Sequence, residues 1–267
     1  MRRRILSVLI CGLLATATLG AARLQPESEA GWRSYIAATE RRIATELSAR
    51  GIFLAMDFTS AAAADRIAVL AGDVVIREVE TVDANGAPID VPSALVHHWR
   101  GDVFVPHATL DEVLAKVESG ALLSAPEDVL KAAVTDRGPG WMTVYLRLQR
   151  KKFVTVVYDT NHDVTFARVS STRATSQSTA TRIAEIDDAG SPNERALPPG
   201  DDHGYLWKLN AYWRYEQVPG GVIVECESIS LSRMVPTLLR YLVAPLIEST
   251  ARESMEHTLR AVRANMS

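Results

Sequence analysis

Two long segments near the C-terminus alternate over most of their length between apolar and polar residues. They cover 205–217 and 222–232, and the tight-turn sequence Val218-Pro-Gly-Gly joins them. Such alternation predicts a long β-hairpin with one face buried and the other wet. A hairpin of this length needs further strands and a helix to cover its apolar face, so it limits the chain to folds built on a large antiparallel sheet.

The register of this hairpin decides which residues share a face. Pairing Val218 with Gly221 places Trp213 opposite Cys226 and Arg214 opposite Glu225. The face expected to be buried carries Tyr205, Trp207, Leu209, Ala211, Trp213, Tyr215, Val222, Val224 and Cys226. The face expected to be mostly wet carries Lys208, Asn210, Arg214, Glu216, Glu225 and Glu227. An exposed Arg214–Glu225 pair would stabilise the fold by only about 0.2–1 kcal/mol.

Helical and extended patterns alternate along the rest of the chain. Thr109-Leu-Asp-Glu has the form of a capping box at the start of a helix. The 236–264 segment has apolar residues at helical spacing, and Pro245 is expected to divide it into a short helix and a long one. Other helices are predicted at 27–50, at 60–70 (or a turn) and from Ser124 on, and strands at 73–82, 95–105, 141–149, 153–159, 163–170 and 174–186. The proline-rich 189–204 loop is the candidate for a mobile flap.

The first 22 residues predict export. Three arginines at 2–4 precede an apolar run at 5–19, and small residues follow at 20–22. This order is typical of a cleaved signal peptide, because the apolar run is shorter than the ~20 residues that span a bilayer. We therefore expect a periplasmic or secreted protein that starts near Ala22, with an uncleaved membrane anchor as the less favoured alternative. Cys226 would then be the only cysteine, and its place in a strand predicts a small buried side chain, not a nucleophile.

Composition excludes several classes of protein. Of the 267 residues, 47% are hydrophobic and 23% are charged, which is enough for a sizeable core. The formal net charge of -3 gives no positive field to hold nucleic acid. The sequence has no glycine-rich phosphate loop, no nucleophile elbow and no His-Glu-x-x-His motif. No cofactor, no metal ion, no nucleic acid and no particular catalytic residue is therefore predicted.

The aromatic strand faces supply the candidate binding residues. Neighbours in a strand point to opposite faces, so His97 and His98 cannot bind one metal together. His97 shares its face with Trp99, and this face either fills a core or lines a ligand site. The residues expected to line a space beside the C-terminal helix are His97, Trp99, Trp207, Trp213, Tyr215, Leu242, Leu246 and Met255.

Two polar groups of residues are weaker candidates. Asp159, His162, Asp163, Asp201, Asp202 and His203 would imitate a metal site only if two turns met, and such residues more often make local hydrogen bonds in turns. Arg147, Arg150, Lys151 and Lys152 could contact an anionic headgroup, although a solvated strand end is the simpler interpretation.

The order of these elements resembles the START-related helix-grip superfamily (SRPBCC), which includes lipid-transfer, polyketide cyclase/aromatase and ubiquinone-binding-like members. The segments that carry the resemblance are Val103-Phe-Val-Pro-His-Ala-Thr-Leu-Asp-Glu-Val-Leu, the 205–233 hairpin and the C-terminal helix. The hairpin also resembles exported bacterial members. The resemblance implies an α+β fold in which a curved antiparallel sheet wraps around a long C-terminal helix. It implies no shared catalytic residue.

We accordingly predict a signal peptide at 1–22, a helix-and-strand extension at 23–92 and a START-like helix-grip domain at 93–267. Two functions stay open. The first is a carrier for a lipid-like or polycyclic molecule held between the sheet and the helix. The second is a cyclase- or hydrolase-like enzyme on the same scaffold, with His97 or a buried carboxylate as its acid/base group. Peripheral membrane contact and the oligomeric state are left open by the sequence.

Overall fold

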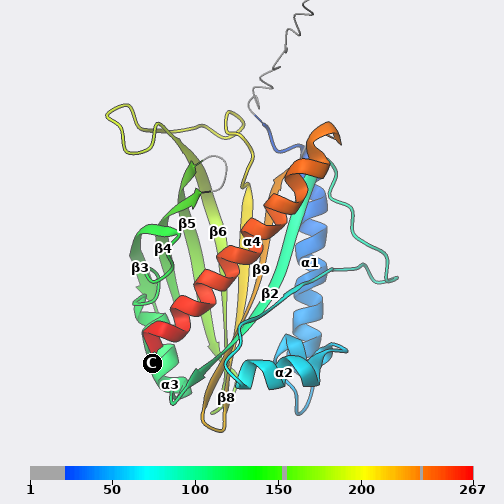
Figure 1. Ribbon diagram of the computed structural model, residues 1–267, viewed down its shortest axis with the longest axis vertical. Helices are drawn as coiled ribbons and strands as arrows, with labels where there is room; N and C mark the ends of the chain where they lie inside the picture. Colours follow the sequence, from blue (N-terminus) through cyan, green and yellow to red (C-terminus); the bar gives the residue numbers. More distant parts are fainter. Residues whose placement is uncertain (1–21, 152–154, 235–236, 267) are drawn as a thin grey trace, which may run out of the picture.

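One antiparallel sheet runs through the whole molecule, in the strand order β1-β2-β9-β8-β6-β5-β4-β3, with the short β7 beside β6. The computed structural model describes residues 22–151, 155–234 and 237–266, and in the last helix it describes side chains from residue 251 on. The strands are β1 Val75–Glu78, β2 Ala94–Pro106, β3 Val129–Gly138, β4 Trp141–Lys151, β5 Thr155–Arg168, β6 Arg173–Asp187, β7 Arg195–Ala196, β8 Lys208–Val218 and β9 Gly221–Arg233. The sheet is curved, and a long helix crosses its concave side (Figure 1).

Helices cover both sides of this sheet. The 3-10 turn η1 (Ala55–Phe58) and the helices α1 (Pro26–Ser48) and α2 (Ala62–Leu70) pack on the convex side, and α3 (Leu110–Ser119) and α4 (Thr237–Met266) lie on the concave side (Figure 1). The predicted capping box is present, because the Thr109 side chain accepts a hydrogen bond from the Glu112 backbone and Glu112 binds the Thr109 backbone in return. The chain therefore has the α+β helix-grip fold that the sequence resemblance implied, with an additional helical layer outside the sheet.

The final hairpin has the predicted register. Trp213 lies opposite Cys226, and Arg214 lies opposite Glu225. Two other predictions were wrong. The segment after Ser124 is a turn followed by strand β3, since residues 129–138 pair along the edge of β4. β5 is one strand where two were predicted, because the expected turn residues 159–163 pair with β4 without a break; the register shift towards β6 leaves its extra residue, Thr181, in β6.

The C-terminal helix also differs from its prediction. α4 continues through Pro245 as one helix, although proline removes one backbone donor. Contact with the sheet holds the part after the proline, where α4 approaches β2 at Gly101. A Cβ atom on Gly101 would lie 2.5 Å from Cδ1 of Leu259 and 2.8 Å from Cγ of Met255. The absent side chain thus sets how closely the helix lies on the sheet.

The N-terminal layer builds its own core on the convex side. Trp32 and Tyr35 of α1 pack with Tyr212, Ile229 and Leu231 of the hairpin, among other residues. Nearer the other end of the strands, a second cluster joins Phe53, Leu54, Met56, Val69, Val75 and Ile223. Residues 23–92 therefore contribute to the core of the same sheet, and β1 extends that sheet at its edge. The predicted boundary at residue 92 remains a prediction.

Candidate functional site

The concave face of the sheet is built from rows of residues that the strand register places side by side. Residues opposite one another in neighbouring strands share a face. One row joins Trp99, Ser228, Ala211, Ser178 and Val164 across five strands. Small side chains therefore occupy the centre of this row, between β2 and β5.

The structure brings His97, Trp99, Trp213 and Tyr215 to this one face, as the sequence predicted. The row beside that of Trp99 includes Gly101, Cys226 and Trp213, and α4 contacts it at Gly101. The Trp213 ring is stacked with that of Tyr215, with ring centroids 6.5 Å apart.

The other four expected site residues are Trp207, Met255, Leu242 and Leu246. Trp207 was misplaced: it precedes β8, packs against the α1 cluster of the convex side and donates to Asp202 through Nε1 at 3.2 Å. Met255 is buried against β2, so it belongs to the seam between helix and sheet. The side chains of Leu242 and Leu246 lie outside the described residues.

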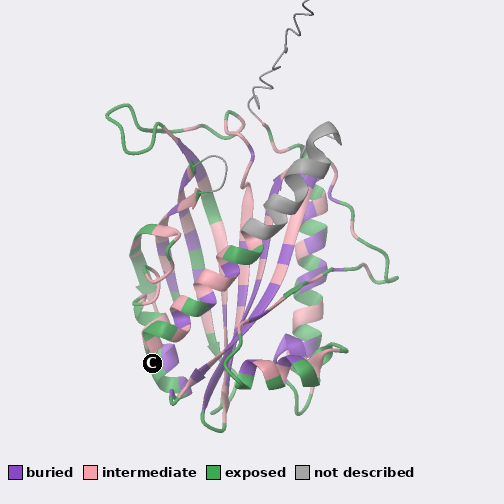
Figure 2. Ribbon diagram, viewed as in Figure 1, coloured by how far each residue is buried: buried purple, intermediate pink, exposed green. Residues whose placement is uncertain are grey.

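Exposure is distributed between the two faces in an unexpected way. His97, Trp99 and Trp213 on the concave face are only half-buried. Along parts of β2 and β9 (97–100 and 227–231), buried and half-buried residues alternate, as the ribbon coloured by burial shows (Figure 2). On the convex face His98, Arg100, Arg214, Glu225 and Glu227 are buried, each 3% exposed or less. The hydrophobic effect alone favours the reverse, with aromatic rings inside and charges outside. The expectation that the Arg214 face is wet was therefore wrong, because α1 and η1 cover it.

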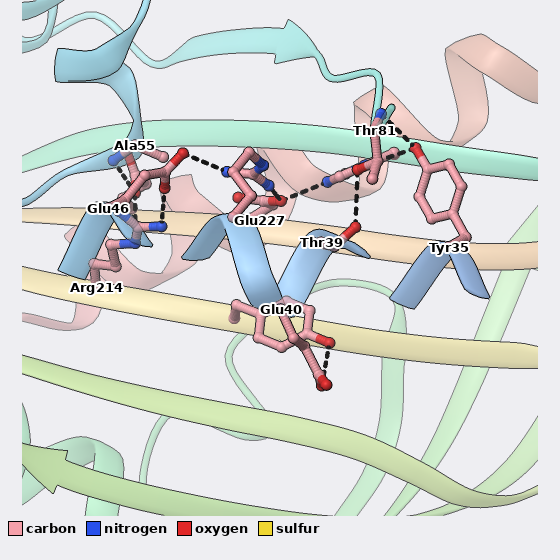
Figure 3. Close-up of polar contacts among 12 residues, drawn as sticks. Tyr35, Thr39, Glu40, Glu46, Ala55, Thr81, Arg214 and Glu227 are labelled. Carbon is pink, nitrogen blue, oxygen red and sulfur yellow. Dashed lines mark hydrogen bonds and ion pairs between the residues drawn. The ribbon is translucent and has the colours of Figure 1, made fainter. Parts of the chain in front are cut away.

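The charged residues of the convex face form a continuous network beneath α1 (Figure 3). Arg214 donates to Glu46 of α1 at 2.5 Å and to the Phe53 carbonyl oxygen at 2.8 Å. Glu46 also accepts from Arg42 at 2.8 Å, and Arg42 in turn pairs with Glu227 of β9. This network fastens α1 to the two strands of the hairpin.

The network continues at both ends. Glu227 lies 2.6 Å from Nε2 of His98, and Nδ1 of His98 lies 3.0 Å from the Tyr35 hydroxyl (Figure 3). At the other end, the Glu225 carboxylate accepts from the backbone N–H groups of Ala55 and Met56 at 2.8 and 2.9 Å, which caps η1. The same carboxylate lies 3.5 Å from Nε of Arg214.

Opposed electrostatic effects act on two carboxyl groups of this network. Burial raises the pKa of Asp102 well above its usual range, and the charge of Glu225, directly opposite on β9, raises it further. Burial would also raise the pKa of Glu227, but its hydrogen bond to His98 and the charges of Arg42 and Arg214 outweigh burial and lower it to about 2. Burial and Glu225 thus favour the protonated form of Asp102 against the ion pair that Arg100 makes with it at 3.0 Å, whereas the partners of Glu227 favour its anion.

The concave histidines have short-range partners of their own. His97 Nε2 lies 2.9 Å from the Ser232 hydroxyl, and burial lowers the pKa of His97 to about 4. His162 Nε2 lies 2.9 Å from Thr160, its Nδ1 lies 3.3 Å from Ser178, and burial likewise lowers its pKa to about 4. Both imidazoles are neutral near pH 7. Sequence reasoning placed His162 in a turn, and its pairing with Val144 of β4 and Ala180 of β6 reveals its position on the concave face.

The polar residues that the sequence singled out make ion pairs with one another and with their neighbours. Within the described ranges no three His, Cys, Asp or Glu side chains are placed to hold a metal ion. His203 pairs with Glu185 at 2.5 Å, and Arg147 pairs with Glu194 at 2.6 Å. Lys152 lies outside the described residues. The ion pair of Arg147 with Glu194 therefore connects β4 to the 189–204 loop.

Two hollows flank α3. One of about 400 Å³ lies between α3 and the ends of β5 and β6, with Leu114, Phe166 and Ala174 in its wall. The other, of about 320 Å³, lies towards the end of α4 and includes His107 and Met266. The first hollow reaches the concave face, because Phe166 pairs with Ser176, the neighbour of Trp213 in its row. In the described part of the chain, no helix is both long and apolar enough to cross a membrane.

This chain is similar to several solved structures. A STAR-related lipid transfer protein from Xanthomonas axonopodis is similar with a TM-score of 0.45 and 17% identity, over 71% of this chain and 98% of that one. The Zhui aromatase/cyclase from Streptomyces sp. R1128 gives 0.39 and 14%, over 64% and 94%. The lipid transfer domain of human StarD13 gives 0.41 and 10%, over 77% and 95%. These are kinds of protein that the sequence resemblance named. No family profile and no curated protein matches the sequence.

Replacing Arg214 tests the buried network. Arg214→Ala leaves the carboxylates of Glu46 and Glu225 buried without their main counter-charge, so the free energy of unfolding should fall by about 3–5 kcal/mol in urea titrations. Arg260→Ala is the matched control, because the Arg260 side chain is 59% exposed and its pair with Glu256 lies within one helix. Its cost should stay below about 0.5 kcal/mol. Equal costs for the two variants would mean that the convex face is wet in solution.

The pH dependence of stability tests the state of Asp102. A carboxyl group whose pKa is raised by folding contributes stability that is fully present below its unfolded pKa, about 3.9, and is lost as pH rises towards the folded pKa. Asp102→Asn removes this loss, so the variant should gain stability relative to the native protein as pH rises from about 4. Asp188→Asn, at an exposed turn, should track the native protein. Parallel stability curves for all three proteins would contradict a protonated Asp102.

Proposed function

We propose that this chain is a carrier that holds a hydrophobic small molecule between the concave face of the sheet and α4. The observation that carries the proposal is the exposure of the two faces. The N-terminal layer seals the charged face, while Trp99 and Trp213 beneath a crossing helix stay half-buried. An apolar ligand on the concave face would remove these rings from water at about 25 cal/mol per Å² of apolar area.

The residues between the aromatic rings support this proposal. Ser228, Ala211 and Ser178 place small side chains at the middle of the concave face. The hollow of about 400 Å³ beside α3 includes Phe166, which belongs to the same row as Trp213. A solid core would instead need large apolar side chains at these central positions.

We propose further that the carrier works in the periplasm or outside the cell. This rests on the charged start, the short apolar run and the small residues of the first 22 positions. N-terminal sequencing of the protein from its own cell envelope should find a mature chain that starts near Ala22. Recovery of a chain that still begins with Met1 would contradict cleavage.

Filling the centre of the concave face tests the carrier proposal. The native protein, purified from its own cell envelope, should show a co-purifying apolar molecule in native mass spectrometry and in solvent extracts. Ser178→Leu combined with Ala211→Leu should abolish that adduct, because the added side chains occupy the space over the small residues. Ser34→Leu, on the exposed side of α1, should retain it.

The controls separate loss of binding from loss of folding. The filled variant should keep a cooperative unfolding transition and a Trp fluorescence spectrum of a folded protein. A folded, filled variant that still carries the native amount of ligand would exclude the concave face as the site. A native protein that never carries an apolar molecule, and shows no fluorescence change with any hydrophobic ligand, would contradict the carrier function.

A further inference from the structure

Helix α2 turns its charged side chains inward and exposes apolar ones. Asp65 is 1% exposed and pairs with Arg77 of β1 at 2.6 Å, and Arg66 pairs with Asp57 of η1 at 2.6 Å. The positions of this nine-residue helix that are exposed to solvent are Ala63, Ala64, Ile67 and Leu70. An ordinary surface helix has the reverse arrangement, with its apolar stripe towards the core. The outer side of α2 is therefore an apolar surface that the described residues leave uncovered.

Further apolar side chains are exposed at the same end of the molecule. The turns at 139–140, 169–172 and 219–220 lie at the end of the sheet where α2 and α3 also lie, and we call it the α2 end (Figure 1). Nine large hydrophobic side chains of the described residues are exposed, and six of them belong to the α2 end: Ile52, Phe58, Ile67, Leu70, Trp141 and Val169. Exposed apolar side chains thus gather at one end instead of being scattered over the surface.

The dimensions of the α2 end fit a lipid surface better than a second copy of the chain. α2 is only about 14 Å long and about 10 Å wide, so its outer side is far smaller than the ~800 Å² that each partner of a stable interface buries. Trp141 begins β4, which is five strand spacings, or about 24 Å, from β2, where α2 packs. A lipid surface is continuous and deformable, so it can receive apolar side chains that lie this far apart.

The charges of the α2 end favour no particular sign of lipid. Arg168 pairs with Asp111, and Arg66 pairs with Asp57. Arg50 and Asp73 add one exposed charge of each sign. Attraction to anionic headgroups therefore contributes little, and insertion of apolar side chains has to supply the binding.

We propose that the α2 end docks on a lipid surface through these apolar side chains. Ile67, Leu70 and Phe58 enter between the headgroups towards the β1 edge of the sheet, and Trp141 lies at the lipid–water interface towards the β3 edge. The inward ion pairs of Asp65 and Arg66 hold α2 in the orientation that this requires. The proposal goes beyond the carrier function and does not rest on it. Both hollows beside α3 belong to the same end, so docking brings them close to the lipid (Figure 1).

Co-sedimentation with phosphatidylcholine vesicles tests the proposal. The protein purified from its own cell envelope should bind these vesicles equally at about 0.1 M and about 1 M NaCl, because salt screens charge attraction and not apolar insertion. Ile67→Asp combined with Leu70→Asp should weaken binding by about tenfold or more, since two charges would have to enter the headgroup region. Val82→Asp is the matched control, because Val82 and Leu70 are both 43% exposed and Val82 lies in the loop that leads from β1 away from the α2 end.

A variant on the other side of the sheet distinguishes a lipid surface from a protein partner of α2 alone. Trp141→Ala should weaken vesicle binding by about threefold, because indole rings favour the lipid–water interface. It should also remove part of the quenching of Trp fluorescence by vesicles of dibrominated phosphatidylcholine. Trp207→Phe, in the cluster beside α1, should leave vesicle binding and the quenching by the remaining rings unchanged. All variants share one N-terminus, so the apolar run at 5–19 cannot cause a difference between them.

Several results would overturn this proposal. The native protein does not sediment with the vesicles, the double aspartate variant sediments as the native protein does, or binding is lost at the higher salt concentration. A native dimer that the aspartate pair converts to a monomer would instead assign α2 to a contact between copies. The aspartate variants should keep the native unfolding transition, because the replaced side chains are already exposed. Each of these results leaves the carrier function standing, since that function is tested by the filled variant of the concave face.

Discussion

The buried ion pairs of Arg214 fix the arrangement of this molecule. Arg214 on β8 binds Glu46 of α1, and Glu225 on β9 caps η1, so the hairpin supplies both signs of charge that the N-terminal layer needs. Breaking such a pair costs more than forming it gains, since the remaining charge stays buried. The N-terminal layer is consequently held in one position on the convex face. That position determines which side of the sheet the N-terminal layer covers.

The exposure of the concave face follows from the position of the N-terminal layer on the convex face. Because the polar side of the hairpin is covered by α1, the elements of the described chain that lie over the side with Trp99 and Trp213 are α3 and α4. α4 comes close at Gly101, where no side chain holds it off, and packs mainly on β2. The centre of the concave face is left with the small residues Ser228, Ala211 and Ser178.

Much of the fold was accessible from local patterns. The hairpin register, the capping box at Thr109 and the opposite orientations of His97 and His98 all follow from spacing along one or two elements. The errors arose where long-range pairing overrides local preference. Residues 129–138 form strand β3 by pairing with the edge of β4. Helix α4 continues through Pro245, and its later part packs on the sheet at Gly101. Trp207 was assigned by strand parity although it precedes the strand.

The sequence by itself determined the two faces of the hairpin, since alternation with a period of two fixes which side chains share a side. It did not determine which face is buried. Charged residues at alternate positions indicate a wet face only if no other element covers them, and the sequence of α1 does not reveal that Glu46 and Arg42 point at β8 and β9. Only the tertiary structure brings these charges together, because ion-pair partners 168 and 185 residues apart become neighbours through folding alone. The position of His162 on the concave face was decided in the same way, because pairing with β4 and β6 continues the strand through residues that the sequence indicated as a turn.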